Sequence, residues 1–194
     1  MRFFRDKSAA GTPRAFEELL SEHLDALYRT ALRLCAGREA DAEDLLQDAM
    51  LRAFQSHASL REPAAGRAWL FTILARTNLN RIRSQRRRAE LAASDLEDNE
   101  FEDALASWRP GDQPDALADA ALLRAHMASA LDALDDSLRS VVWLSDVEGF
   151  RQREVADMLG IPEGTVASRL FRARRSLRTI LQRTAPGVGA GRHA

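Results

Sequence analysis

Two stretches of the sequence carry arginines with amide or hydroxyl side chains at helical spacing, a combination suited to binding polyanions. The first group follows steps of four, three and four residues and would share one helix face: Arg76, Asn80, Arg83 and Arg87. Six arginines and no acid fall between residues 76 and 88, and such a run repels itself unless an anion is near. An arginine stripe can also be a merely solvated face, but the missing acids favour nucleic acid as the ligand.

The second stretch, residues 151–175, has the spacing of a helix-turn-helix. Ala156 is small enough for two helices to cross closely, Gly160 ends the first helix, and Pro162 can start the second because it needs no N–H there. Four apolar residues would close the core between the helices: Val155, Leu159, Val166 and Leu170. The outer face would then present Thr165, Ser168, Arg169 and Arg172, flanked by Arg174 and Arg175. Arginine can donate two hydrogen bonds to guanine, while hydroxyls and further arginines hold phosphates, so we expect DNA recognition rather than a structural hairpin.

Little else in the chain could build a chemical site. The four histidines (His23, His57, His126 and His193) are scattered, Asp44 and Asp48 alone make a weak metal pair, and no phosphate-binding loop of the Walker type is present. The single cysteine, Cys35, lies on the apolar side of a predicted helix, where it is expected to pack in the core. We therefore expect no enzymatic activity, no cofactor and no metal.

The elements that position the two arginine groups are predicted to be helices throughout, because apolar residues recur at three- and four-residue steps. Helices are expected at about 13–35, 40–55 and 68–89, and again from about 120 onward. The predicted fold is all-α, with two small helical domains at 13–90 and 120–183, an acidic linker at 91–119 and a flexible tail at 184–194.

Charge is divided along the chain in the same way. The net charge is −1, with 29 acidic and 28 basic residues. Residues 76–88 carry six arginines, residues 89–121 carry ten acids against one arginine, and residues 151–183 carry eight arginines against three acids. This division predicts two polyanion-binding modules joined by an acidic linker that repels polyanions.

The composition also bears on the cell compartment. No apolar run approaches the roughly 18 to 20 residues that span a bilayer, and the first residues lack the apolar stretch of a signal peptide. We therefore expect a cytoplasmic protein without membrane insertion.

Three segments of the chain resemble one known family. Residues 148–175, from Glu148-Gly-Phe150 through the helix-turn-helix, are similar to region 4 of bacterial extracytoplasmic-function (ECF) sigma factors. Residues 41–54, Asp-Ala-Glu-Asp-Leu-Leu-Gln-Asp-Ala-Met-Leu-Arg-Ala-Phe, resemble the region 2 helix that docks on RNA polymerase. Residues 68–74, Ala-Trp-Leu-Phe-Thr-Ile-Leu, resemble the start of the family's promoter-melting helix.

The resemblance implies a protein that binds core RNA polymerase, brings it to promoter DNA and opens the duplex, and that is commonly held inactive by an anti-sigma factor wedged between its domains. It implies polymerase contacts at Asp41, Asp44, Leu45, Gln47, Asp48, Leu51 and Arg52. It implies contacts with a flipped base and the non-template strand of the minus-10 element at Arg61, Arg67, Trp69, Arg76, Asn80, Arg83 and Arg87, although Trp69 can equally cap the domain core. It implies minus-35 contacts at Thr165, Ser168, Arg169, Phe171, Arg172, Arg174 and Arg175.

Two departures from the family pattern bear on these contacts. Ala167 stands where Lys or Arg is usual, which removes one minus-35 contact, and Arg76 stands where Asn is common. Two other functions stay open at this point: a sigma-like decoy or adaptor that binds a regulator without initiating transcription, and a plain helix-turn-helix regulator. The second of these would not explain the acidic helix at residues 41–54.

Overall fold

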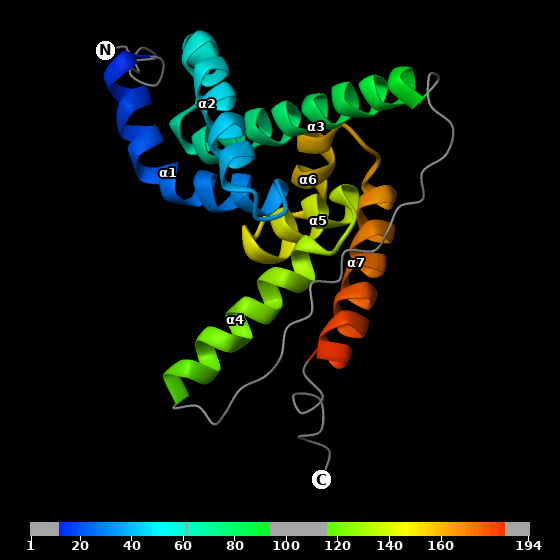
Figure 1. Cartoon of the computed structure of the whole chain (residues 1–194). Helices are drawn as coiled ribbons and strands as arrows, with labels where there is room; N and C mark the ends of the chain where they lie inside the picture. The colour runs from blue at the N-terminus through cyan, green and yellow to red at the C-terminus, as the bar shows by residue number, and fades with distance from the viewer. Residues whose placement is uncertain (1–11, 61, 94–115, 185–194) are drawn as a thin grey trace, which may run out of the picture.

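The computed structural model describes residues 12–60, 62–93 and 116–184, and every regular element in these ranges is helical (Figure 1). The predicted all-α class is confirmed. Most of the predicted acidic linker, the predicted tail and Arg61 lie outside the described residues.

The first half consists of three long helices. They are α1 (Pro13–Leu34), α2 (Glu39–Ser56) and α3 (Gly66–Ala93), with the short helical turns η1 (His57–Ser59) and η2 (Pro63–Ala65) between the last two. Thr12 caps α1 by accepting a hydrogen bond from the Ala15 N–H, and Gly37, at φ +75°, lies in the turn after it. Gly66 lets α3 begin against α1, because a Cβ there would lie 2.6 Å from a methyl group of Leu19.

The second half contains four α-helices and a π-helical turn. They are α4 (Ala116–Asp132), α5 (Asp136–Val142), the π-helical turn η3 (Trp143–Val147), α6 (Gln152–Leu159) and α7 (Glu163–Thr184). Arg139, 5% exposed, holds the α4–α5 turn by donating to the carbonyls of Leu131 and Asp132 at 3.0 and 2.9 Å. Helix α6 ends at Gly160, as predicted, and this residue is left-handed, at φ +63°; Pro162 immediately precedes α7 and accepts the first backbone hydrogen bonds of that helix.

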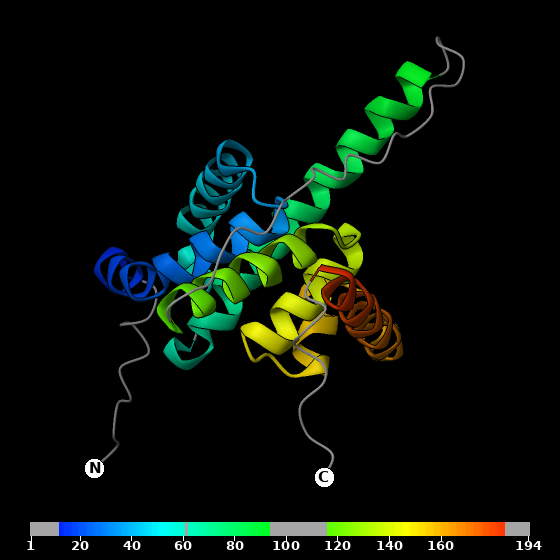
Figure 2. The same ribbon diagram turned by 60° about the horizontal axis from the view of Figure 1, so that its bottom comes forward.

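The two halves pack directly against each other. Figure 1 shows α6 beneath α3, and Figure 2 shows the far end of α3 projecting beyond the rest of the molecule. The rings of Phe71 in α3 and Phe150 before α6 meet edge to face, with centroids 5.1 Å apart. The residues predicted to close the helix-turn-helix core are all buried, and so is Cys35. The apolar spacing therefore predicted the core of each half, while the packing of one half on the other emerges only in the structure.

Candidate nucleic-acid interface

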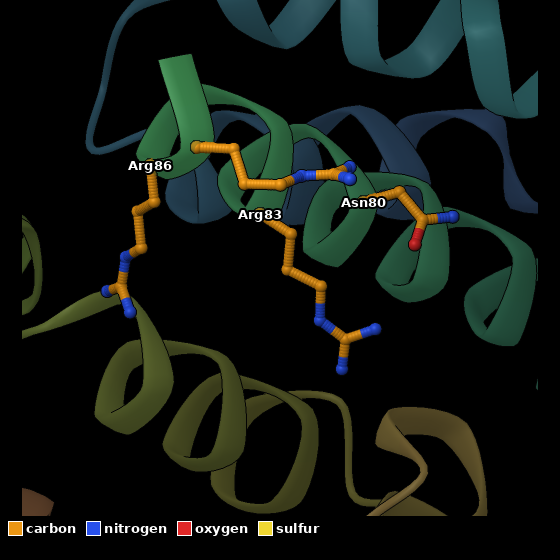
Figure 3. Close-up of a pocket in the computed structure, with 4 residues that line it drawn as sticks. Asn80, Arg83 and Arg86 are labelled. Carbon is orange, nitrogen blue, oxygen red and sulfur yellow. The ribbon is translucent and has the colours of Figure 1, made fainter. Parts of the chain in front are cut away.

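The basic face of α3 forms as the spacing predicts. Asn80, Arg83 and Arg87 are exposed and, with Arg86, line an open hollow along the helix (Figure 3). Leu70, Leu74 and Thr77 face the core on the opposite side. Residues 12–60, 62–93 and 116–184 supply no ion pair or hydrogen bond to the side chains of Arg83 or Arg87. These guanidinium groups are thus available to phosphates or bases.

Two other arginines of the predicted minus-10 set are occupied by the second half of the chain. Arg67 donates to the Glu148 carboxylate at 2.8 Å and to the Glu148 carbonyl at 2.9 Å, and its guanidinium lies over the Phe71 and Phe150 rings. Arg76 is exposed but donates to the carbonyls of Asp157 and Met158, at 3.0 and 3.3 Å. The sequence did not indicate these contacts, because they join residues about eighty positions apart.

Trp69 is half-buried and packs against the apolar core. This placement agrees with the alternative in which it caps the domain, rather than with a free stacking surface for a strand.

The helix-turn-helix presents one exposed face on α7. Phe171 is 68% exposed and has Arg172 and Arg175 beside it, both exposed, while Val166, Leu170, Ala173 and Leu177 face inward. Ser168 is also exposed and donates its hydroxyl to the Thr165 carbonyl at 3.0 Å. An exposed phenylalanine among arginines suits a major groove, where a thymine methyl can be contacted beside bonded phosphates.

Two predicted minus-35 residues are not free on this face: one is bonded within the second half, and the other faces α3. Arg174 forms two hydrogen bonds with Asp146 of the π-helical turn, at 2.9 and 2.7 Å, and this bonding raises the pKa of Arg174. Arg169 is half-buried and lines a cleft between the halves together with Arg83 and Arg86 of α3. In this arrangement Arg169 therefore faces α3 instead of the open face of α7.

A third surface lies on the other side of the first half, between α1 and α2. Its lining is mostly apolar: Phe16, Leu20, Leu46, Met50, Leu51 and Phe54. Leu51 and Phe54 are 56% and 55% exposed, large values for such side chains, and Asp44, Gln47 and Asp48 are exposed on the same helix. Exposed apolar side chains rimmed by acids are typical of a protein-binding surface.

One residue of the predicted polymerase set does not lie at the surface. Leu45 is 0% exposed, because it lies on the core side of α2 with Ala42 and Ala49. Phe54 was not selected from the sequence, although it lies one helical turn after Leu51 and is equally exposed.

Acidic residues near this surface are partly engaged by arginines. Asp41 accepts a hydrogen bond from Arg38, its carbonyl accepts one from Arg81 at 3.2 Å, and Arg81 also lies 3.9 Å from the Asp44 carboxylate. The Arg81 contacts tie the N-terminal part of α2 to α3, so the acidic rim and the basic helix are positioned together.

Within the described residues no three His, Cys, Asp or Glu side chains are grouped closely enough to hold a metal ion. Across the same ranges, none of the helices combines the length and apolarity needed to cross a membrane.

Comparison with known proteins gives a consistent answer. Family models for Sigma-70 region 2 and Sigma-70 region 4 match residues 19–88 and 126–177. The ECF RNA polymerase sigma factor SigL of Mycobacterium tuberculosis is 36% identical over 176 residues, which cover 90% of this chain and 93% of SigL. The ECF RNA polymerase sigma factor SigE of Mycolicibacterium smegmatis is 34% identical over 168 residues, or 86% of this chain but only 62% of SigE.

Solved structures agree in fold. The sigma factor RpoE of Bartonella quintana, in complex with the anti-sigma factor NepR, has a TM-score of 0.62 and 30% identity, with 87% of this chain and 98% of RpoE covered. CnrH in complex with the cytosolic domain of CnrY has a TM-score of 0.59 and 29% identity, with 91% and 94% covered. On these matches, and on the motifs that predicted them, the chain belongs to the ECF family of RNA polymerase sigma factors.

Proposed function

We propose that this sigma factor binds core polymerase, the minus-10 element and the minus-35 element through three separate surfaces. Residues 13–90 bind core polymerase through the α1–α2 groove and the minus-10 element through α3, residues 120–183 bind the minus-35 element through α7, and residues 91–119 link them. The observation that carries this proposal is that two exposed basic faces lie on different halves, while an apolar groove occupies a third surface.

The α3 face suits a single strand with an extruded base. Asn80 can hydrogen-bond a base edge, and Arg83 and Arg87 can hold the backbone beside it. Extruding a base costs a few kcal/mol, which contacts in the hollow and backbone charge must offset. Arg76 joins this face once its contacts with α6 are released, and Arg67 becomes free at the start of the same helix once it leaves Glu148.

The α7 face suits the major groove of duplex DNA. Ser168, Phe171 and Arg172 lie toward its N-terminal half, the part of a recognition helix that contacts base edges. Arg175 and, after release from Asp146, Arg174 are placed to hold phosphates, with Thr165 and Arg169 nearer the edge of the contact.

The α1–α2 groove suits a helical element of the polymerase clamp. Leu51 and Phe54 would supply the apolar contact, and Asp44, Gln47, Asp48 and Arg52 the polar rim, with Asp41 at the edge. The protein would then act with polymerase in the cytoplasm, without catalysing a reaction by itself.

A regulatory partner is part of this proposal. RpoE is described in complex with NepR, which is named an anti-sigma factor. CnrH is described in complex with the cytosolic domain of CnrY. We infer that this chain also has an anti-sigma factor.

The decisive experiment adds the purified protein to bacterial core RNA polymerase on a library of genomic fragments and maps the transcript starts. Discrete starts that share two upstream elements are expected. Leu51→Ala/Phe54→Ala should remove both polymerase binding and starts, whereas Asn80→Ala should remove starts and leave polymerase binding intact. Polymerase binding without any transcript starts would instead indicate the decoy. The absence of both polymerase binding and transcript starts would indicate a plain DNA-binding regulator.

A further inference from the structure

A buried carboxylate joins the two halves of the chain. The Glu148 side chain is 8% exposed and accepts hydrogen bonds from Arg67 at 2.8 Å and from the Thr30 hydroxyl at 3.0 Å. The Thr30 hydroxyl in turn accepts a hydrogen bond from the Trp143 indole N–H at 3.0 Å. Glu148 and Trp143 come from the second half, while Thr30 in α1 and Arg67 in α3 come from the first.

This network depends on the two halves staying together. A buried carboxylate is stable only while donors surround it, and both side-chain donors to Glu148 come from the other half. Thr30 is itself 0% exposed, and each of the three side-chain hydrogen bonds joins one half to the other, so separating the halves would break all of them. The network is therefore specific to the closed arrangement.

The same interface occupies two arginines of α3. Arg67 binds a carboxylate, and Arg76 binds the last carbonyls of α6, where the negative end of the helix dipole lies. A guanidinium holds carboxylate and phosphate with the same donors, so Glu148 occupies Arg67 as a backbone phosphate of the strand would.

The closed arrangement also conflicts with the spacing of the promoter elements. The minus-10 and minus-35 elements lie about 25 base pairs apart, on the order of 85 Å along a duplex at 3.4 Å per base pair. In the structure α6 of the helix-turn-helix packs directly on α3 (Figure 1). One molecule cannot bind both elements in this arrangement, so the halves must separate first.

We propose that Glu148, Thr30, Arg67 and Trp143 form a latch that holds the free protein closed and hides Arg67 and Arg76 from single-stranded DNA. The claim that the latch hides Arg67 and Arg76 from the strand rests on the proposed function. The claim that the latch holds the two halves together does not. Promoter or polymerase binding then competes with the latch, and a strand binds only the fraction of molecules that is open.

Thr30→Val tests the latch without changing charge, since valine keeps the shape of threonine and removes the hydroxyl that joins Glu148 to Trp143. Glu148→Gln removes the charge that Arg67 pairs with. Thr179→Val, at an exposed threonine of α7, controls for the first substitution, and Glu18→Gln, at an exposed glutamate of α1, controls for the lost charge. All are made in the full chain.

Two measurements are made on each variant: the radius of gyration by small-angle X-ray scattering, and the affinity for fluorescein-labelled oligothymidylate. Both latch variants should increase the radius of gyration relative to wild type and both controls. If the latch biases the wild type about tenfold toward the closed state, oligothymidylate should bind up to about tenfold more tightly to the latch variants.

An unchanged radius of gyration in both latch variants would overturn the latch. A larger radius with unchanged oligothymidylate affinity would overturn the hiding of the strand-binding face. Circular dichroism checks folding, and if Thr30→Val does not fold, Trp143→Phe, which keeps an aromatic ring but removes the indole N–H, is measured in the same way. Transcription with core polymerase reports separately on the proposed function, because its failure leaves the scattering result standing.

Discussion

Arg174 on the recognition helix and Asp146 in the π-helical turn form a two-bond ion pair, with distances of 2.9 and 2.7 Å, inside the second half of the chain. The Arg174 side chain is 58% exposed, so it lies at the protein surface although its guanidinium is already bonded. Binding of Arg174 to a phosphate therefore competes with a contact that the free protein makes.

Asp146→Asn should strengthen binding to minus-35 duplex DNA. Exposed ion pairs contribute little stability, so the expected gain is modest, up to about fivefold. If Arg174 then binds the DNA backbone more fully, the slope of log affinity against log salt concentration should steepen by about one, the value for one additional phosphate contact. Fluorescence anisotropy at several salt concentrations measures both quantities. A loss of affinity would show that Asp146 orients Arg174 for DNA.

Arg172→Ala should reduce discrimination at one base of the minus-35 element. If Arg172 binds a guanine with two hydrogen bonds, substitution of that base should cost the wild type about 1 to 3 kcal/mol and the variant much less. Competition binding with a set of singly substituted duplexes gives these differences. A loss that is equal for all duplexes would make Arg172 a phosphate contact instead.

Leu51 and Leu45 should respond differently to truncation, although they lie in the same helix. Leu51→Ala should weaken core polymerase binding by roughly tenfold while leaving stability nearly unchanged, because its side chain is 56% exposed. Leu45→Ala should lower the free energy of unfolding by about 2 to 5 kcal/mol, because Leu45 is fully buried. Urea unfolding and polymerase pull-down separate the two effects. Equal destabilisation by both variants would contradict the assignment of Leu51 to a binding surface.

The Cys35 thiol should react slowly with thiol reagents. Its burial raises the pKa of the thiol, and the Arg81 charge only partly opposes this. The native protein should therefore react with a thiol reagent more slowly than the protein in urea at the same pH. Since the folded state holds the proton more firmly, the free energy of unfolding should fall as pH rises above about 8.5, the pKa of an ordinary thiol. Cys35→Ala should lose this part of the pH dependence, and rapid native labelling would contradict the assigned burial.

Local sequence determined the helices and the faces they present. The steps of three and four residues predicted the exposed stripe of Asn80, Arg83 and Arg87, and the helix-turn-helix pattern predicted that a helix ends at Gly160, which the structure shows to be left-handed. These features follow from short-range physics: helical periodicity, the steric freedom of glycine and the burial of apolar side chains. Leu45 shows the limit of reasoning from a family motif, because the motif marks a helix as a binding element without separating its buried side from its exposed side.

Tertiary structure alone decided how the charged residues are used. Arg67, Arg76 and Arg174 look alike in the sequence as free cations, yet each is bonded, to Glu148, to the end of α6 and to Asp146 respectively. Two of these partners belong to the other half of the chain, about eighty residues away. A charged side chain carries no periodicity that names its partner, so its pairing is set by the packing of α6 on α3 and by the desolvation of Glu148, which no local pattern encodes.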